Sequence, residues 1–426
     1  MECDILVVGA GVLGLSSAYY LKKGNPEKSV VVVDRLGGPG QGNSAKSEGG
    51  YRNLFTSESN YLLADSTIDF MHHMEDDMGH DLKLSEMGYL FLYSEEQYAR
   101  YRGALKRIEE RGSETRIIGK EELKGMIPGL VTDFEGDEEA ELLGLEPVDM
   151  GVFGAKCGGV DADALVRAYE SEFLKAGGET RYGTEVEELI IKPVEELEIP
   201  GEPFVWQDVH ITGVKTSKGD IEAETTVVAT GVWSEKLLDP VGLDSYMRPK
   251  KRQIFAFKDS RLSSLLEVKG FNSYGAIPLT ILPKAAILFR PEFSEGTFWL
   301  ACADDLGRAF GLEDEPEAEE DYYTNNVYHV LVKYFPCFED VRPVNMWAGQ
   351  YAINSFDSLP VVTGEEGLIY VGAASGSGIM KCDAIGRIVA AKYAGEEGAE
   401  LYGGRRFKVA DLGISERNVE RETLII

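Results

Sequence analysis

Strand-like and helix-like patterns of apolar residues alternate over the first 34 positions of the chain. Residues 4–8 form an apolar run that is too short for a helix and rich in β-branched side chains, which predicts a buried strand. Apolar residues then recur at helical spacing over residues 15–23, and residues 30–33 form a second buried run that ends at Asp34. The pattern therefore predicts a strand–helix–strand unit.

Three glycines lie in the turn between the first predicted strand and the helix. Gly9 permits a tight turn, Gly11 lets the backbone approach a pyrophosphate, and Gly14 lets the helix pack closely on the strand. Val12 and Leu13 begin the helix, whose N-terminus offers backbone N–H groups and a partial positive charge to phosphates. Strand, glycines, helix and second strand follow one another as a dinucleotide-binding fingerprint requires.

The residues that follow the second strand bear on which dinucleotide is bound. Asp34 lies where a carboxylate accepts hydrogen bonds from a ribose, whereas a basic residue such as Arg35 can hold the 2′-phosphate of NADP. The alternative to dinucleotide binding is an ordinary strand–helix–strand unit with a glycine turn. The fingerprint by itself leaves the cofactor open.

The remaining pattern predicts more strands than helices in the middle of the chain. The acidic stretch 133–141 predicts a solvated loop because its like charges repel, and the Pro/Glu-rich stretch 192–207 predicts a surface excursion. Strands are expected at 87–93, 185–191, 209–216, 221–229, 253–257, 285–289, 297–301 and 368–371, and helices at 66–77, 95–111, 162–176, 322–335 and 379–394.

Composition and charge narrow the class of protein and its partners. The 426 residues are too many for one ordinary core, so two or three domains are expected. The net charge of −30 argues against nucleic acid as a partner. We expect no metal site from His72, His73 and His80, because adjacent positions on a helix point in different directions.

Cysteine spacing and hydropathy predict a cytoplasmic protein. The five cysteines are scattered without a Cys-x-x-Cys pair, which is typical of free thiols in a reducing compartment. No apolar run approaches the roughly 20 residues that a transmembrane helix needs. The acidic N-terminus leads directly into the glycine fingerprint, so we do not expect it to be a signal peptide.

A stretch of small and turn-forming residues, 37–50, follows the second strand. Small residues allow close approach of the backbone to a ligand, and Ser44 and Ser47 can donate to a phosphate or a flavin. Arg52 can pair with a carboxylate through two parallel hydrogen bonds. A flexible surface loop with a solvated arginine is the alternative interpretation.

This loop resembles that of a known family of flavoproteins. The segment 42–44 (GNS), followed by 49–55 (GGYRNLF), is similar to the loop after the second strand in the D-amino-acid-oxidase superfamily. The closest resemblance is to the branch of the sarcosine oxidase β-subunit, dimethylglycine dehydrogenase and dye-linked L-proline dehydrogenase. Five further short matches occur in the expected order, at 88–92, 159–162, 227–233, 248–253 and 376–380.

The resemblance implies FAD as the cofactor and an α/β fold. That fold has a Rossmann-like FAD-binding domain with a parallel sheet, interleaved with a β-sheet-based substrate domain. The implied FAD-binding domain comprises residues 1–86, 151–245 and 346–426, and the implied substrate-binding domain comprises residues 87–150 and 246–345.

The resemblance also implies which residues contact FAD and how FAD is held. Gly349 stands where one branch has its cysteine, and the N-terminal loop has no histidine, so we expect non-covalent FAD. The implied cofactor-binding residues are Gly9, Gly11, Val12, Leu13, Gly14, Asp34, Arg35, Gly42, Asn43, Ser44, Ser47, Gly50, Val186, Ala229, Thr230, Gly231, Trp233, Gly349, Gly372, Gly376, Gly378, Ile379 and Met380.

The family's chemistry is oxidation of a carbon–nitrogen bond by hydride transfer from the substrate's α-carbon to flavin N5. The implied substrates are L-proline or an N-methylated amino acid such as sarcosine, with oxygen, a quinone or an artificial dye as the electron acceptor. The protein's tasks are to hold the carboxylate and to keep the amine unprotonated. The candidate catalytic residues are Arg52 as carboxylate anchor, Met380 or Lys381 as second anchor, Arg290 from the predicted sheet, and Tyr351 as a pocket wall, with Tyr274 as a further wall.

Two other functions remain open at this point. A 2-hydroxy acid also carries a carboxylate that an arginine can hold, so a 2-hydroxy-acid dehydrogenase fits the same scaffold. A non-catalytic FAD-binding subunit of a larger complex is the other possibility.

Overall fold

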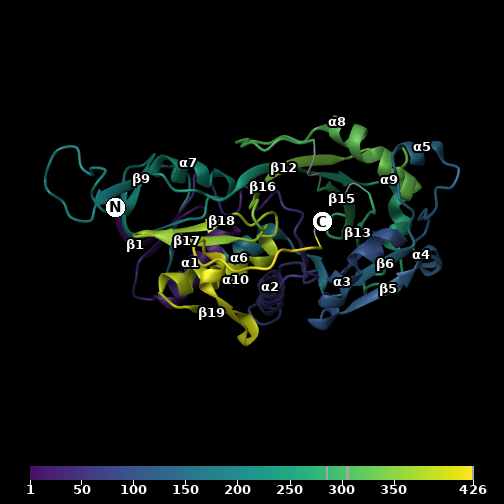
Figure 1. Ribbon diagram of the computed structural model, residues 1–426, viewed down its shortest axis with the longest axis horizontal. Helices are drawn as coiled ribbons and strands as arrows, with labels where there is room; N and C mark the ends of the chain where they lie inside the picture. The colour runs from purple at the N-terminus through teal and green to yellow at the C-terminus, as the bar shows by residue number, and fades with distance from the viewer. Residues whose placement is uncertain (285, 304–306, 425–426) are drawn as a thin grey trace.

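The computed structural model describes residues 1–284, 286–303 and 307–424, and two eight-stranded sheets organise them (Figure 1). The first sheet lies with the N-terminus in the left half of Figure 1, and the second lies in the right half. The chain passes several times between the sheets, so each domain is built from separate segments. The α/β fold with interleaved sheets that the sequence predicts is confirmed.

The first sheet has a parallel centre in the order β18-β11-β1-β2-β8, with antiparallel neighbours at β17, β10 and β9. Both faces are covered, because alternate residues of β1 enter two different cores, as in parallel sheets generally. Its strands are β1 (Glu2–Val8), β2 (Val30–Val33), β8 (Glu179–Arg181), β9 (Val186–Pro193), β10 (Val209–Thr216), β11 (Ile221–Val228), β17 (Val361–Glu365) and β18 (Leu368–Gly372).

Helices cover the first sheet, and the longest of them pack on one another. Helix α1 contacts both α6 and α10, and α2 packs on α10. On the other face lie the β9–β10 hairpin and the short helix α7. These helices are α1 (Val12–Gly24), α2 (Glu58–Asp76), α6 (Ala162–Lys175), α7 (Ser234–Leu238) and α10 (Cys382–Tyr393).

The second sheet has the order β16-β12-β15-β14-β13-β4-β6-β5 and a separate aromatic-rich core. Helix α3 (Glu95–Glu110) packs on β4, and α4 (Lys120–Met126) packs on β5 and β6. Its strands are β4 (Tyr89–Tyr93), β5 (Thr115–Gly119), β6 (Met150–Gly154), β12 (Arg248–Phe257), β13 (Leu279–Ile281), β14 (Ile287–Glu292), β15 (Thr297–Cys302) and β16 (Asn345–Ile353). Two small ribbons pair β3 (Gly50–Arg52) with β7 (Cys157–Gly159), and β19 (Gly398–Glu400) with β20 (Arg406–Lys408).

Strand pairing places two segments on the other side of the expected domain division. Apart from their first residues, β6 and β16 fall within the ranges assigned to the FAD-binding domain, yet both belong to the second sheet. β6 pairs antiparallel with β4, and β16 pairs along nearly its whole length with β12. The chain therefore enters and leaves the second sheet a few residues away from the expected boundaries.

The acidic stretch 133–141 was expected to be a solvated loop; most of it is exposed and residues 133–137 are not helical, but the loop assignment is wrong for residues 138–141. It contains most of the helix α5 (Glu138–Leu142), which Asp137 caps by accepting hydrogen bonds from the backbone N–H groups of residues 139 and 140. Lys333 forms ion pairs with Asp137 and Glu139, and Ala140 is buried. The opposite charge that permits this helix is almost 200 residues away in the sequence.

Other elements differ from the expectation in their bounds. The expected helix 322–335 is divided into α8 (Glu320–Tyr322), a π-helical turn (Tyr323–Tyr328) and α9 (His329–Tyr334). Ala285, the first residue of an expected strand, lies outside the described residues. Within the described residues no cysteine forms a disulfide bond, and no helix is long and apolar enough to cross a membrane.

Candidate functional site

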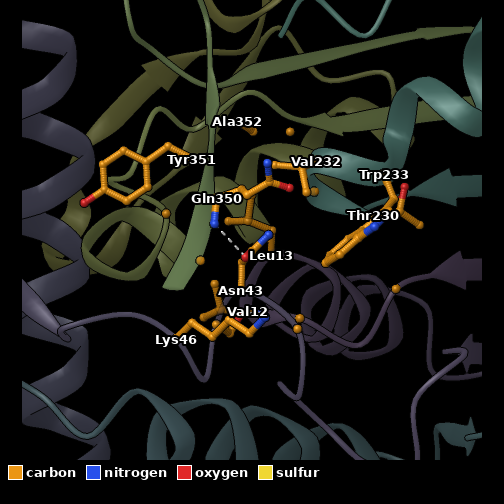
Figure 2. A pocket seen from close by; sticks show the side chains of 18 of the residues that line it. Val12, Leu13, Asn43, Lys46, Thr230, Val232, Trp233, Gln350, Tyr351 and Ala352 are labelled. Carbon is orange, nitrogen blue, oxygen red and sulfur yellow. Dashed lines mark hydrogen bonds between the residues drawn. The ribbon is translucent and has the colours of Figure 1, made fainter. Parts of the chain in front are cut away.

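A cavity of about 540 Å³ lies between the two sheets (Figure 2). Residues that follow the carboxyl ends of β1, β2, β11 and β18 line one side, and residues from β12, β14, β15 and β16 line the other. In open α/β sheets the carboxyl ends of parallel strands form the usual ligand-binding edge. The cavity volume is in the range typical of cofactor and small-molecule sites.

The glycines of the first turn shape the cavity's floor for two different reasons. Gly9 has φ +106° and a Cβ there would lie 2.6 Å from the backbone oxygen of Ala229, while a Cβ on Gly14 would collide with the carbonyl of Gly9. A Cβ on Gly11 would meet only the Ser44 hydroxyl, at 3.4 Å. Gly9 and Gly14 are thus required by packing, whereas Gly11 leaves open space at the N-terminus of α1, where a phosphate can approach.

Asp34 and Arg35 stand at the edge of the cavity at the end of β2. The Asp34 carboxylate accepts hydrogen bonds from the N–H groups of Ala10 (2.7 Å) and Leu36 (2.8 Å), which fix its orientation. The Arg35 guanidinium lies 4.7 Å from the ring centre of Trp233, and the Trp233 indole N–H donates to Asp314. Arg35 and Trp233 therefore form one wall of the cavity.

The loop 42–48 is attached to strand β16 of the second sheet. Asn43 accepts a hydrogen bond from the backbone N–H of Gln350 at 2.9 Å (Figure 2), and the Trp347 indole donates to the carbonyl of Lys46. A Cβ on Gly349 would lie 3.0 Å from the Lys46 Cβ and 3.3 Å from Asn43 Oδ1. Close packing of Gly349 against loop 42–48 is therefore a reason for glycine at this position.

The C-terminal glycine-rich junction closes the cavity beside Tyr351. Gly376 has φ +81°, and a Cβ there would collide with the Tyr351 ring. Tyr351 projects from β16 into the cavity region (Figure 2). Burial raises the pKa of Tyr351 to about 12; the nearby Glu48 carboxylate adds to the rise and Arg252 opposes it. The carboxylate of Glu48 and the guanidinium of Arg252 therefore both lie near the Tyr351 hydroxyl.

Comparison with known proteins gives this cavity a family context. A model of the DAO family, described as FAD dependent oxidoreductase, matches residues 4–392. The chain belongs to this family. FAD-dependent oxidoreductase domain-containing protein 1 of Xenopus laevis is 24% identical over 422 residues, which cover 91% of this chain and 78% of that protein. Sarcosine oxidase subunit beta of Rhodobacter capsulatus is 28% identical over 126 residues, which cover 29% of this chain and 30% of that protein.

A solved structure shares the fold of this DAO-family protein. L-proline dehydrogenase from P. horikoshii superimposes with a TM-score of 0.72 at 21% sequence identity, over 93% of this chain and 94% of that one. The predicted membership of the D-amino-acid-oxidase superfamily and the predicted FAD cofactor are confirmed.

The residues of the cavity fit FAD. The unhindered approach at Gly11 and the helix N-terminus suit the pyrophosphate, Asp34 suits a ribose, and the wall of Trp233 and Arg35 suits an aromatic ring. All the cofactor-binding residues expected from the sequence line the cavity except Gly14, Gly50 and Met380. Gly14 packs under the turn, and Gly50 pairs with Gly159 in the ribbon of β3 and β7.

FAD is expected to be released intact when the protein is denatured. Within the described residues Cys302 is the one cysteine that lines the cavity, no histidine lines it, and glycine occupies position 349. We therefore expect acid precipitation to leave the yellow colour in the supernatant, measured by absorbance at 450 nm. Colour that remains with the polypeptide would contradict this, and Cys302→Ser would then show whether Cys302 is the point of attachment.

The structure does not bring Arg52, the expected carboxylate anchor, to the cavity wall. Its side chain is buried, stacks on Phe55 at 4.3 Å, and donates to the backbone carbonyls of Leu54 (2.6 Å) and Leu424 (3.1 Å). Burial lowers the pKa of Arg52, and the nearby Glu422 carboxylate opposes this. The C-terminal tail thus accepts a hydrogen bond from the guanidinium that the sequence had assigned to a substrate carboxylate.

Arg290 and Met380 are also absent from the cavity wall, and Tyr274 is largely exposed. Arg290 is buried and donates to the carbonyl of Glu48 through Nε (3.1 Å) and Nη2 (2.5 Å), and to Glu292 through Nη1 (2.8 Å). It therefore braces the loop that carries Glu48. Of the five expected catalytic residues only Tyr351 lines the cavity.

Lys381 is buried behind the cavity and has a depressed pKa. Its ammonium donates to Asn60 Oδ1 (2.5 Å) and to the Ser377 hydroxyl (2.7 Å). Burial, together with the charge of Arg52, lowers the pKa of Lys381 from 10.5 to about 7. Lys381 thus joins Arg52 and Glu422 in one buried charged cluster.

Lys381 is expected to contribute a rise in the free energy of unfolding between pH 7 and about pH 10. In this range the unfolded chain binds more protons at this lysine than the folded chain does, so raising the pH favours the folded state. Lys381→Met should reduce the rise, measured by urea unfolding at pH 7 and pH 9.5. Lys392→Met, near the end of α10, is the control. An equal rise in Lys381→Met and wild type would contradict the assignment.

Some residues of the cavity wall were not singled out from the sequence. Arg252 and Gln253 belong to a stretch that carries the family resemblance, which was the one available signal. Glu48 and Lys46 lie in a loop without periodicity, so no sequence pattern indicated their direction. Burial lowers the pKa of Lys46, opposed by the charge of Glu315.

Proposed function

We propose that this DAO-family protein oxidises the carbon–nitrogen bond of a small amino acid, with L-proline or an N-methylated amino acid such as sarcosine as the favoured substrate. The observation that carries the proposal is the charge pattern at one end of the cavity. Glu48 and Arg252 both line the cavity and both influence the pKa of Tyr351, which lies at the same end. An amino acid carries one positive and one negative group and matches such a surface.

The protein's own residues perform binding and positioning in this proposal. The glycine turn and Asp34 hold FAD, which when bound supplies the two-electron oxidant. The Tyr351 ring is held against Gly376 and forms a wall for the substrate. Apolar residues of the second sheet, such as Ile254 and Leu288, exclude water from the reacting carbon.

Two of the proteins reported above support the amino-acid class of substrate. One is named L-proline dehydrogenase and another sarcosine oxidase subunit beta. The reduced cofactor must pass its electrons to an acceptor, and oxygen, a quinone or an artificial dye would serve. Reoxidation of the reduced protein by air, compared with reoxidation by a dye, distinguishes an oxidase from a dehydrogenase.

The test is an anaerobic screen with the purified holoprotein. L-Proline, sarcosine and glycine are compared with the 2-hydroxy acids lactate and glycolate, and loss of flavin absorbance at 450 nm is followed. Bleaching by an amino acid supports the proposal. Bleaching by hydroxy acids alone would indicate a 2-hydroxy-acid dehydrogenase, and no bleaching by any compound would indicate a non-catalytic FAD-binding subunit.

A further inference from the structure

Glu48 is an acidic residue of the cavity wall whose carboxylate no group among the described residues neutralises by direct contact. It lines the cavity beside Ser47. Within the described part of the chain, no side-chain or backbone donor bonds its carboxylate, and no lysine or arginine forms an ion pair with it. Charged groups that are removed from bulk water are usually paired, because an unpaired buried charge is costly. An unpaired carboxylate in a cavity is therefore suited to a cationic ligand.

The backbone that presents Glu48 is fixed on both sides. Arg290 donates two hydrogen bonds to the Glu48 carbonyl, and its other hydrogen bonds go to Glu292 and to the carbonyl of Pro291. The next residue, Gly49, accepts a hydrogen bond from the N–H of Val160 at 2.9 Å. The guanidinium thus positions Glu48 through its main chain and leaves its side chain unpaired.

The charged and titratable groups that face Glu48 come from three strands. They are Arg290 from β14, Tyr89 from β4 and Tyr351 from β16. Burial raises the pKa of the Glu48 carboxyl, and the charge of Arg290 opposes the rise. A carboxylate with a raised pKa is a better proton acceptor than one in water.

We propose that Glu48 binds the ammonium group of the substrate and accepts its proton before the α-carbon is oxidised. The inference rests on the proposed function and adds the residue that makes it selective for amino acids. A 2-hydroxy acid has no positive charge to offer to Glu48 and would leave the carboxylate unpaired, which disfavours its binding.

One proton moves from the substrate nitrogen to Glu48. An N–H bond of the ammonium breaks, an O–H bond forms on Glu48, and the nitrogen keeps the electron pair of the broken bond. The neutral amine can then form a C=N bond when the α-hydrogen leaves with its electron pair. FAD is the oxidant for that second step, and the product is an iminium cation.

The test compares Glu48→Gln with wild-type holoprotein in anaerobic flavin reduction by L-proline and sarcosine between pH 7 and pH 10. Loss of a general base costs about 10²–10⁴-fold in rate, and we expect a loss of about 100-fold or more at pH 7. Because the variant must use substrate that is already neutral, its rate should rise about tenfold per pH unit below the amine pKa. The wild-type rate should rise less steeply, and Glu48→Asp should recover part of the rate at pH 7.

Two controls separate proton transfer from a general disturbance of the site. Glu86→Gln removes an exposed carboxylate that pairs with His72 and does not line the cavity, and should leave rate and pH profile unchanged. Tetrahydro-2-furoate has the shape of proline with an ether oxygen in place of the amine. Its inhibition constant should be equal or lower in Glu48→Gln, because the variant has no negative charge to leave unpaired.

Each other outcome overturns a stated part of the proposal. If amino acids bleach both proteins at equal rates and with the same pH profile, Glu48 does not handle the amine, although the proposed function stands. If Glu48→Gln loses bound flavin, or binds tetrahydro-2-furoate much more weakly, Glu48 supports the cofactor or the pocket instead. If no amino acid bleaches the wild type, the proposed function and this inference both fail.

Discussion

Gly11→Val is expected to abolish retention of FAD while leaving the fold intact. A Cβ at position 11 meets only the Ser44 hydroxyl, at 3.4 Å, so the backbone tolerates a side chain. The two methyl groups of valine would extend into the space at the N-terminus of α1, where the pyrophosphate has to approach the backbone. We expect FAD to bind at least about 100-fold more weakly, which corresponds to about 2.7 kcal/mol.

The measurement is the flavin-to-protein ratio after gel filtration, with circular dichroism as a check of folding. Gly24→Val is the matched control, because Gly24 lies at the other end of α1 and a Cβ there has no neighbour within 4 Å. Gly11→Ala, with a single methyl group, should show an intermediate loss. A folded Gly11→Val protein that keeps one FAD per chain would show that the pyrophosphate does not lie at this turn.

Arg52→Ala is expected to lower the free energy of unfolding by about 2–4 kcal/mol. The substitution removes donors from two carbonyl groups, Leu54 and Leu424, and removes the cation next to the buried carboxylate of Glu422. It also leaves the Phe55 ring without its stacked guanidinium. Because Leu424 belongs to the C-terminal tail, the tail should detach from the body of the protein at lower denaturant concentration than the rest unfolds.

Urea unfolding and limited proteolysis of the tail measure this effect. Arg107→Ala is the control, since Arg107 also contacts the tail, through Thr423, but at an exposed position. Sequence resemblance had instead assigned Arg52 to the substrate carboxylate. If Arg52→Ala keeps wild-type stability but loses roughly 30- to 1000-fold in kcat/KM, equivalent to about 2–4 kcal/mol, that assignment holds and the tail moves aside in the working enzyme.

Glu422 is expected to make the stability of the C-terminal tail contact depend on pH. Hydrogen bonds from Thr56 and the neighbouring backbone, with the charge of Arg52, lower the pKa of Glu422 although burial opposes them. Its contribution is therefore present above the carboxyl's ordinary pKa and is lost as the pH falls through the lower, folded value. The tail contact should weaken in acid before the first sheet does.

The sequence by itself predicted the glycine turn at residues 9–14, because the contacts that shape this turn are local. The tight turn at Gly9, the open approach at Gly11 and the packing of Gly14 depend on steric contacts within one strand–helix–strand unit or directly beneath it. A residue without a side chain is required wherever two backbones approach so closely. The two runs of buried strand and the helix between them were recognisable for the same reason, since their periodicity is a property of neighbouring residues.

Tertiary structure alone decided the direction of the charged side chains. Arg52 is held by a carbonyl 372 positions away, Lys381 by an asparagine 321 positions away, and Arg290 by the carbonyl of Glu48 242 positions away. The helix α5 likewise depends on a distant lysine. A long flexible side chain takes the direction that its partners offer, and each of these three side chains has a partner that is distant in the sequence. The local pattern therefore specified where FAD can bind, whereas long-range packing decided which charges reach the cavity and left Glu48 among them.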